Sequence, residues 1–495
     1  MARKPYLALA LLSSALLFNT NTKASVDNLL PRPQHVELLK GRCNTSRLKP
    51  EGFYLQEELK SLLTKHGSTV DARSPIVVRM TLVPSLPKVF FNKEEAYRLR
   101  ITPSGIFIDA PDLVGMYRGM QTLEQLLMSA KRKGELEACD IIDWPSFRMR
   151  GLMLGLGDTF VPMDELKKRV RLLSQYKVNT LHLHLTGREA WRLESKRYPQ
   201  LTQAQHTTNM PGKYYTLAEL QELARLCQEH RITLIPEIDM TGANSVFSRA
   251  MGFDMQTPQG KRVLKEILSE LAEGIDMPYI HLGTDEAASM DRRFLSEMVA
   301  HVRSLGKKAI AWDSESESQG QEVDRLHLSS PEGVSVYGQP AVGARLQSLD
   351  QGSLLADLEK LYSSRILGLA SSTSSQRGAI LCVWGDRPAE VPLATTSDSG
   401  VYPHMLALAE RAWLGGGSGY FALPTKVVSS EVSTKTREAF IDFERRLLWH
   451  KAQVFVSEPF SYVVQPQGEK AIPPTTTTVS AMPQRPKGKG NAPRY

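Results

Sequence analysis

The chain lacks the features that mark membrane, zinc and nucleic-acid-binding proteins. No internal run among its 495 residues reaches the roughly 18–20 apolar residues that span a bilayer. Its four cysteines have no CxxC spacing, which argues against a zinc site. Its net charge of +8 is dispersed through the chain, whereas nucleic-acid binding needs a basic face or stripe. With 41% hydrophobic and 23% charged residues, the composition is that of a soluble globular protein of several domains.

The first residues have the pattern of a secretory signal peptide. Arg3 and Lys4 precede the mostly apolar stretch Tyr6–Phe18, and a polar segment with the small residue Ala24 follows. We therefore predict a Sec signal peptide over residues 1–25 and a secreted or periplasmic protein, with no integral membrane segment after signal removal. An uncleaved membrane anchor is the alternative.

An exported protein is able to form disulfides. Cys43 and Cys139 lie near the two ends of one predicted domain, and the sequence leaves open whether they pair. Cys227 falls in an amphipathic helical pattern and Cys382 in an apolar strand, and both are predicted to be buried thiols.

Residues 26–143 are predicted to form a small α+β domain. Ile76–Leu82 is rich in β-branched residues, and Tyr97–Ile101 and Gly105–Ile108 alternate around a turn, as in a hairpin. Gly115–Leu127 then has apolar residues at helical spacing.

Residues 144–455 are predicted to form a (β/α)₈ TIM barrel, because strands alternate with helices. The expected strands are Met149–Leu156, Val178–Thr186, Ile232–Met240, Tyr279–Thr284, Lys308–Trp312, Arg325–Ser329, Val334–Gly338 and Ala379–Trp384. The alternative is a doubly wound open sheet, although no Gly-rich phosphate loop follows the first strand. Residues 456–495 are predicted to be a truncated or disordered basic tail rich in proline and threonine.

The ends of the predicted strands carry the residue types that bind sugars. Catalytic residues of such barrels come from the C-terminal ends of the strands. Carboxylates bind sugar hydroxyls, and the apolar face of a pyranose packs on aromatic rings. The candidates are Arg150, Arg188, Glu237, Asp239, His281, Asp285, Glu286, Trp312, Asp313, Trp384 and Asp386.

Several ordered motifs resemble one known family. The segment from His281 to Glu286 reads His-Leu-Gly-Thr-Asp-Glu and looks like the His-x-Gly-Gly-Asp-Glu signature of the glycoside hydrolase family 20 β-N-acetylhexosaminidases. The segments from Arg150, Leu181 and Ile235 resemble the family's first three barrel strands, and that from Ala409 resembles its last helix. The small domain is similar to the family's N-terminal accessory domain.

The resemblance implies retaining hydrolysis in which the substrate's 2-acetamido group, not a protein carboxylate, attacks the anomeric carbon. By match, Glu286 is the general acid and Asp285 orients the acetamido group. The resemblance also implies a set of substrate-binding residues: Arg150, His281, Trp312, Trp384, Asp386 and Arg188. In this set, Arg150 binds sugar hydroxyls and Asp386 binds distal hydroxyls. Trp312 and Trp384 form the walls of the sugar site.

The sequence departs from the family pattern beside the general acid. Gly187 and Arg188 replace an Asp-Asp pair, and Ala243 stands where a histidine is usual. Gly155 replaces an aspartate of the first strand, and Tyr337 is a weak match for the acetamido-binding tyrosine. Arg188 would lower the pKa of Glu286 if the two lie close together, or would bind an anionic group such as sulfate.

The sequence as a whole predicts an exo-acting β-N-acetylhexosaminidase that removes terminal GlcNAc or GalNAc from glycans. A weakened homologue that binds sugar, and a related hydrolase of altered specificity, are the alternatives. No cofactor, metal or nucleic-acid partner is expected. His182 and His184 share one face of a strand, and a packed barrel interior is their expected place.

Overall fold

The structure is a computed structural model of the chain. The residues it describes are 25–130, 134–157, 159–240, 245–283, 292–312, 323–328, 341–343, 348–349, 358–363, 366, 378–383, 401–416, 434–458 and 460. The predicted signal peptide and most of the predicted tail lie outside them.

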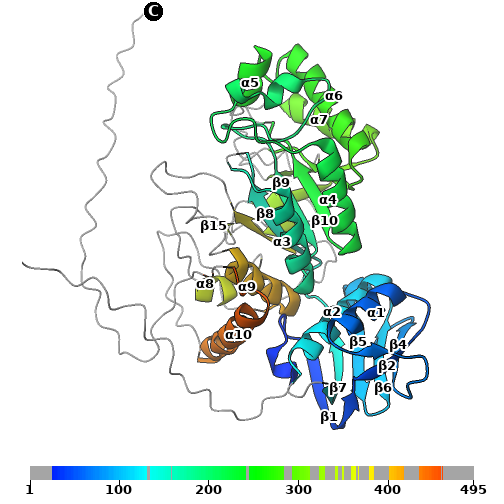
Figure 1. Ribbon diagram of the computed structural model, residues 1–495. Helices are drawn as coiled ribbons and strands as arrows, with labels where there is room; N and C mark the ends of the chain where they lie inside the picture. Colours follow the sequence, from blue (N-terminus) through cyan, green and yellow to red (C-terminus); the bar gives the residue numbers. More distant parts are fainter. Residues whose placement is uncertain are drawn as a thin grey trace, which may run out of the picture.

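The N-terminal part is a seven-stranded mixed sheet with two helices on one face (Figure 1). Its strand order is β1-β7-β5-β6-β4-β2-β3, and β5 and β6 form the predicted hairpin. The elements are β1 (His35–Asn44), β2 (Arg47–Glu51), α1 (Gln56–Lys65), β3 (Thr69–Val70), β4 (Val77–Leu82), β5 (Tyr97–Thr102), β6 (Gly105–Ala110), α2 (Leu113–Met128) and β7 (Glu135–Asp143), with the short 3₁₀ turns η1 (Ser25–Asn28) and η2 (Lys93–Glu95).

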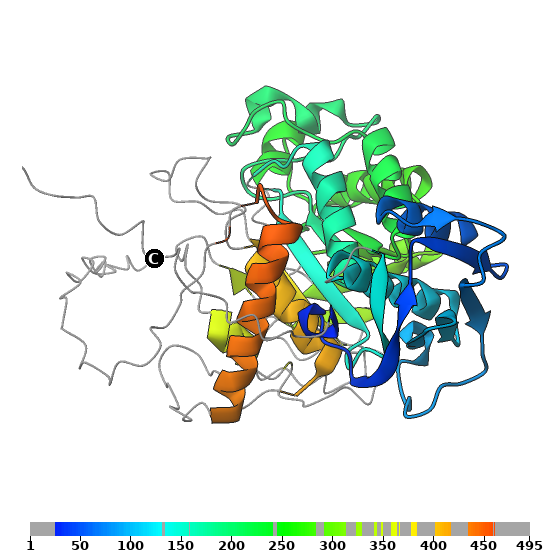
Figure 2. The same cartoon turned by 60° about the horizontal axis from the view of Figure 1, so that its bottom comes forward.

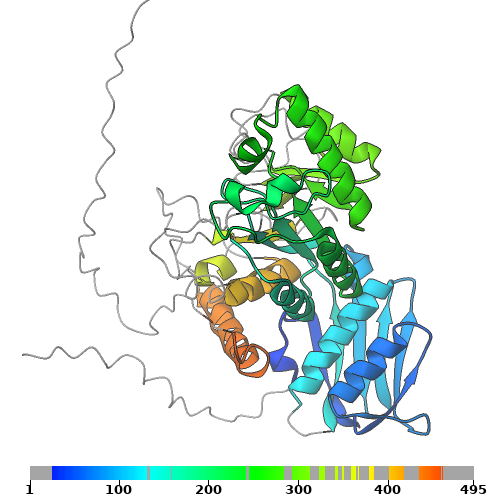
Figure 3. The ribbon, with the colours of Figure 1, turned by 45° about the horizontal axis from the view of Figure 1, so that its top comes forward.

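Helix α2 lies between this sheet and the second part of the molecule (Figure 3). It begins at Asp112, whose side chain accepts a hydrogen bond from the N–H of Val114 and so caps the helix. Gly115 allows close packing, since a Cβ there would lie 2.1 Å from the carbonyl oxygen of Ala96. On the opposite face, Gln121 donates to the carbonyl oxygen of Ser174 in the barrel. The helix is therefore buried on both sides.

The second part is a closed barrel of parallel strands, which confirms the predicted fold class. Strands β8 to β14 pair in chain order, and the ring closes because β16 pairs with both β14 and β8. The short β15 pairs with the other end of β16. The strands are β8 (Met149–Gly155), β9 (Thr180–His184), β10 (Thr233–Glu237), β11 (Tyr279–His281), β12 (Lys308–Trp312), β13 (Arg325–Leu328), β14 (Ala341–Gly343), β15 (Ser348–Leu349) and β16 (Gly378–Val383).

Helices cover the outside of the barrel (Figures 1 and 3). They are α3 (Met163–Gln175), α4 (Leu217–Glu229), α5 (Ser245–Met251), α6 (Pro258–Gly274), α7 (Arg292–Ser304), α8 (Leu358–Ser363), α9 (Val401–Leu414) and α10 (Thr434–Gln453), with 3₁₀ turns η3 (Pro199–Thr202) and η4 (Ala204–His206). The seventh predicted strand, Val334–Gly338, lies outside the described residues, and β14 follows it. None of the described helices is long and apolar enough to cross a bilayer.

Helix α10 connects the end of the barrel to the start of the described chain (Figure 2). Leu448 and Trp449 are part of this helix. The ring of His450 is fully buried between the hydroxyl of Tyr176, at 3.0 Å, and the carbonyl oxygen of Asn28, at 2.8 Å. Burial lowers the pKa of His450 to about 3, so the ring is neutral in the folded protein.

All four cysteines are buried free thiols, so Cys43 and Cys139 do not form a disulfide. The register of β1 and β7 explains this, because Cys43 faces Leu136 and Cys139 faces Leu38. The two thiols are therefore not opposite each other. Cys227 and Cys382 are buried, as predicted.

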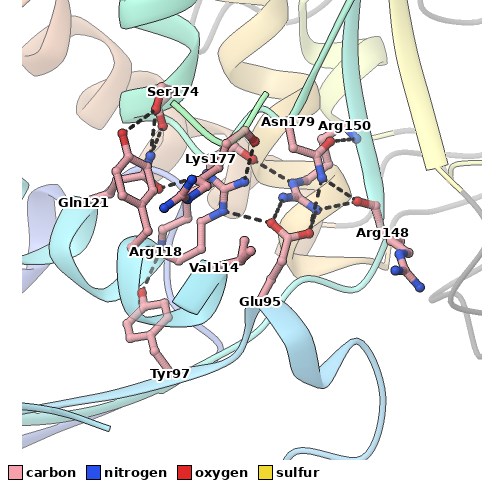
Figure 4. Close-up of polar contacts among 12 residues, drawn as sticks. Glu95, Tyr97, Val114, Arg118, Gln121, Arg148, Arg150, Ser174, Lys177 and Asn179 are labelled. Carbon is pink, nitrogen blue, oxygen red and sulfur yellow. Dashed lines mark hydrogen bonds and ion pairs between the residues drawn. The ribbon is translucent and has the colours of Figure 1, made fainter. Parts of the chain in front are cut away.

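A buried ion cluster joins the accessory domain to the N-terminal end of the barrel (Figure 4). Glu95 accepts hydrogen bonds from Arg118 at 2.8 Å and from Arg150 at 3.0 Å, and both guanidinium groups are fully buried. Burial alone would raise the pKa of Glu95, but the charges of Arg150 and Arg118 outweigh it and hold the pKa below its usual value. Glu95 is therefore an ionised carboxylate between two arginines.

The cluster corrects the sugar-binding role predicted for Arg150. Arg150 is the second residue of β8, so its side chain lies at the N-terminal end of the barrel, away from the strand ends where substrates bind. Its other hydrogen bonds go to carbonyl oxygens of Phe147, Arg148 and Lys177. It is a structural residue of the domain junction.

A second carboxylate, Asp143, lies beside Glu95 at the junction. It pairs with Lys177 at 3.0 Å and accepts a hydrogen bond from the indole N–H of Trp413 at 2.7 Å. The hydroxyl of Tyr97 also donates to it. Two carboxylates and three cations thus fix the two domains against each other.

Replacing Glu95 with Gln tests the importance of the cluster. The change leaves Arg118 and Arg150 buried without a counter-charge, so we expect the free energy of unfolding to fall by about 3–5 kcal/mol in urea titrations. Glu94→Gln is the matched control, because Glu94 is half exposed and 3.8 Å from Arg148; we expect it to cost less than about 1 kcal/mol. Equal effects of the two variants would contradict this interpretation.

Candidate active site

The register of the barrel strands brings four polar side chains together near their C-terminal ends. Glu237, the last residue of β10, pairs with His184 of β9 on one side and with His281 of β11 on the other. Two residues before His184, His182 points to the same side of β9, since side chains alternate along a strand. A common alignment of three neighbouring strands therefore builds this group.

Glu237 is the centre of this polar cluster. Its carboxylate lies 2.7 Å from Nε2 of His182 and 3.2 Å from Nδ1 of His281, and it accepts a hydrogen bond of 2.8 Å from Nε1 of Trp312. His184 lies further away, at 4.0 Å. The rings of His182 and His281 are 4.7 Å apart, and that of Trp312 is 5.0 Å from His281. The cluster is buried inside the barrel, at the C-terminal ends of these strands.

Glu237 is held in its ionised form by its neighbours. Burial would raise the pKa of Glu237, but His281, His184 and His182 outweigh it and hold the pKa well below its usual value. Burial lowers the pKa of His182 to about 4. Near neutral pH the folded protein therefore holds an ionised Glu237 beside a neutral His182.

Gly283 follows β11 and precedes Asp285 and Glu286 in sequence. Its φ of +65° is in the left-handed region, which favours glycine. A Cβ there would lie 2.7 Å from Cα and 2.6 Å from Oδ1 of Asp239, so Gly283 packs directly on the segment that follows β10. The N–H of Gly283 also lies 3.1 Å from Nδ1 of His281. Without a proton, Nδ1 of His281 accepts from this N–H; with a proton, it donates to Glu237 instead. The ring of His281 therefore connects the carboxylate to Gly283.

The loop after β9 is held by one buried arginine. Arg192 is fully buried and donates hydrogen bonds to five carbonyl oxygens, of Leu156, Thr159, Asn209, Met210 and Lys213. Thr186 forms an isolated antiparallel β-bridge with Trp191, the residue before Arg192. Arg188 lies between them on an exposed turn at the barrel rim, and its carbonyl oxygen accepts from the hydroxyl of Ser245.

The structure tests only some of the predicted site residues. Asp285 and Glu286 lie outside the described residues, as do Trp384 and Asp386. Their roles stay predictions. Asp313, a candidate from its strand end, and Ala243 and Tyr337, noted where the family pattern is broken, also lie outside the described residues.

Two predicted substrate-binding residues are part of the buried cluster. His281 has no exposed surface, so its role as a sugar contact is corrected: it positions Glu237 and the Gly283 turn. Trp312 is 2% exposed, and its role as a wall of the sugar site stays a prediction. Sequence reasoning named Glu237 as a candidate but assigned it no role. His182 and His184 are in the barrel interior, as predicted.

The cluster also contains a possible set of metal ligands. Donor atoms of His182, Glu237 and His281 lie within 4.8 Å of one another. However, the carboxylate already accepts from Trp312 and contacts His182 at hydrogen-bond distance. The indole hydrogen bond and the close contact with His182 thus already engage both oxygens of this carboxylate.

Comparison with known proteins shows which family the chain resembles. Residues 147–252 match the model of the glycosyl hydrolase family 20 catalytic domain, and residues 27–144 match that of family 20 domain 2. The chain is therefore similar to glycoside hydrolase family 20 in both of these parts. The family models thus meet at the junction that holds Glu95, Asp143 and Arg150.

Relatives agree with this assignment. A β-N-acetylhexosaminidase of Cellulomonas fimi is 32% identical over 269 residues, covering 48% of this chain and 53% of the relative. A β-hexosaminidase of Vibrio furnissii is 27% identical over 361 residues, covering 59% and 58%. The matches thus span little more than half of these relatives. The crystal structure of a β-N-acetylhexosaminidase of Bacteroides fragilis has a TM-score of 0.69 at 22% identity, covering 88% of this chain and 97% of that one, which shows a shared fold.

Gly283→Ala tests whether the turn after β11 requires glycine. The added methyl group would collide with Asp239, so we expect a loss of several kcal/mol in the free energy of unfolding, or no folded protein. Gly306→Ala is the matched control, because Gly306 also has a positive φ, of +74°, but a Cβ there meets no atom within 4 Å. The control should cost about 1–2 kcal/mol, and an equal cost in both would show that backbone strain alone accounts for the effect.

The buried neutral histidines predict that stability falls with acid. Between the lowered pKa values of His182 (about 4) and His450 (about 3) and their usual value near 6.5, the unfolded chain binds protons that the folded chain does not. Each such group lowers the free energy of unfolding by about 1.4 kcal/mol per pH unit as the pH falls from 6.5 towards its folded pKa.

Urea unfolding at pH 7, 6, 5 and 4.5 measures this slope. His450→Gln keeps one donor for Asn28 and one acceptor for Tyr176, and should reduce the slope by the contribution of one group. A slope that does not change in this variant would show that His450 is not the neutral, buried group described here.

Proposed function

We propose that the protein is an exo-acting β-N-acetylhexosaminidase that removes terminal GlcNAc or GalNAc from glycans. The observation that carries the proposal is the match to the glycosyl hydrolase family 20 models, together with the Glu237–His281 cluster at the end of β11, the strand that precedes Asp285 and Glu286 in sequence. Relatives named β-N-acetylhexosaminidase and N,N′-diacetylchitobiase support the same substrate class.

In the proposed reaction the 2-acetamido oxygen of the substrate attacks the anomeric carbon, while Glu286 protonates the leaving oxygen. Asp285 accepts a hydrogen bond from the acetamido N–H and stabilises the positive charge that develops there. Glu286 then accepts a proton from the water that opens the cyclic intermediate. Glu237 and His281 fix the end of β11 as far as Gly283, two residues before Asp285 in sequence.

We also propose that the protein is exported and acts in the periplasm or outside the cell. The support is the pattern of residues 1–25, with two basic residues before a short apolar stretch. Glycans with terminal N-acetylhexosamine are the proposed partners.

One feature of the rim favours a second possibility, a preference for sulfated sugars. Arg188 stands on an exposed turn that follows β9, at the catalytic end of the barrel. Gly187 and Arg188 replace an Asp-Asp pair of the family, so a positive charge stands where negative charge is usual. A guanidinium group at the rim would pair with a sulfate oxygen on the substrate.

Release of p-nitrophenol from its N-acetyl-β-glucosaminide and N-acetyl-β-galactosaminide tests the main proposal. The purified protein should hydrolyse at least one of them, and Glu286→Gln should lower kcat/KM by about 10²–10⁴-fold because the proton donor is lost. Glu229→Gln, an exposed change at the end of α4, is the control and should keep full activity. No hydrolysis, or equal rates in wild type and Glu286→Gln, would overturn the assignment.

Arg188→Asp tests the preference for a sulfated sugar. If Arg188 binds sulfate, the variant should lose about tenfold or more in kcat/KM for the 6-sulfated N-acetylglucosaminide and keep its rate on the neutral one. If Arg188 instead lowers the pKa of Glu286, the variant should gain activity on both substrates, with its alkaline limb shifted to higher pH. Unchanged rates on both would exclude either role.

A further inference from the structure

A second cleft lies at the opposite end of the barrel from the candidate active site. Its volume is about 430 Å³, and both domains line it. The barrel contributes Met149, Thr180, Thr233 and Tyr279, each at the start of its strand. We call it the junction cleft, because its other wall is the accessory domain beside the Glu95 cluster. Since it lies at the N-terminal ends of the strands, it is not part of the catalytic pocket.

The charged groups of the junction cleft favour an anion. Three arginines line it, Arg118, Arg148 and Arg231, against two glutamates. Glu95 is already held by Arg118 and by the buried Arg150 behind the wall, so its charge is compensated. Arg148 is half exposed and only loosely paired, at 3.8 Å from Glu94. Positive charge therefore remains available at the mouth of the cleft.

Two buried polar atoms in the cleft wall have no hydrogen-bond partner among the described residues. One is Oδ1 of Asn92, a residue that is 5% exposed, and the other is Nε of Arg231. The amide group of Asn92 cannot simply turn over, because its nitrogen donates to the carbonyl oxygens of Pro145, at 2.9 Å, and Ser146, at 3.3 Å. A buried acceptor and a buried donor left unpaired are each costly, by roughly 1–3 kcal/mol.

A ligand that pairs with both atoms must carry one hydrogen-bond acceptor and one donor. Nε of Arg231 is a cationic donor and suits an anionic oxygen, whereas Oδ1 of Asn92 needs a hydroxyl or N–H donor. A bare anion supplies no donor for Asn92. A neutral sugar supplies no negative charge for Arg231. Asn179, Thr233 and Gln228 add neutral polar groups to the wall, and Tyr279 adds an aromatic ring on which a pyranose face packs.

We propose that the junction cleft is a non-catalytic binding site for an anionic saccharide, one that carries a sulfate, phosphate or carboxylate group. The anionic group pairs with Arg231 and Arg148, and a ring hydroxyl donates to Oδ1 of Asn92. The site holds a glycan on the accessory-domain side of the barrel while leaving the catalytic end of the strands open. It does not depend on the catalytic activity proposed above.

Isothermal titration of the full-length protein with glucose 6-sulfate, glucose and inorganic sulfate tests the site. These probes lack the 2-acetamido group that the catalytic end is expected to hold, and the variants described next separate binding in the cleft from any binding of sulfate at Arg188. We expect glucose 6-sulfate to bind about tenfold or more tightly than either of the other two, because only it satisfies both Asn92 and Arg231.

Three variants link this binding to the cleft. Arg231→Asn removes the cation while keeping a residue that tolerates the positive φ of 56° at this position, and Arg148→Gln removes the exposed cation. Each should weaken binding of glucose 6-sulfate about fivefold or more. Arg225→Gln, an exposed change elsewhere on α4, is the matched control and should leave binding unchanged. The thermal midpoints of the ligand-free variants report whether each is folded, and Arg148→Gln keeps the test valid if Arg231→Asn is not.

Three outcomes would overturn the proposal. The first is no binding of glucose 6-sulfate at 20 mM, roughly the limit of a useful millimolar site. The second is equal binding of sulfate alone, which would show a simple anion site. The third is binding that Arg231→Asn and Arg148→Gln leave unchanged, which would place the sugar elsewhere. Hydrolysis of N-acetylhexosaminides is expected to be the same in all three variants, so failure here is distinct from failure of the catalytic proposal.

Discussion

The arrangement of the two domains depends on the buried pairing of Glu95 with Arg118 and Arg150. Ions are costly to remove from water, and removing one partner of such a group leaves an uncompensated buried charge. The cluster therefore allows essentially one geometry between the accessory sheet and the barrel. It also explains why Arg150, at the start of the first barrel strand, is not a sugar ligand: the carboxylate that it requires comes from the other domain. The junction cleft is a consequence of the same contact.

At the other end of the barrel, strand register brings the buried polar side chains together, whereas ion pairing does so at the junction. Glu237 is aligned with His184 and His281 by hydrogen bonds between neighbouring strands, and Trp312 completes the group from the next strand. The carboxylate remains charged because its neighbours supply donors on several sides. Just beyond this cluster, Gly283 packs so closely on Asp239 that a side chain there would collide with it.

Much of the fold was predictable because it depends on local patterns. Alternating strands and amphipathic helices indicated the barrel, and the hairpin around Ser104 indicated the accessory sheet. What could not be read from local patterns were pairings between distant residues. Arg150 has the same sequence neighbours whether it faces a sugar or Glu95, and only the packing of α2 against the barrel decides between the two. The offset of Cys43 from Cys139 likewise depends on the register of β1 with β7, which includes an irregularity between Leu38 and Arg42.

The place of Trp413 has a consequence for how the chain folds during synthesis. Its ring belongs to the apolar core of the accessory domain, and its indole N–H bonds Asp143, which precedes it by 270 residues. At about 5–20 residues per second, a ribosome makes that stretch in roughly 15–50 s. Over that interval the first domain emerges with one part of its core missing, and Asp143 and Lys177 are without the indole that packs over them. The core of the N-terminal domain is therefore completed by α9, one of the last helices of the barrel. The two domains thus reach their final structure together rather than one after the other.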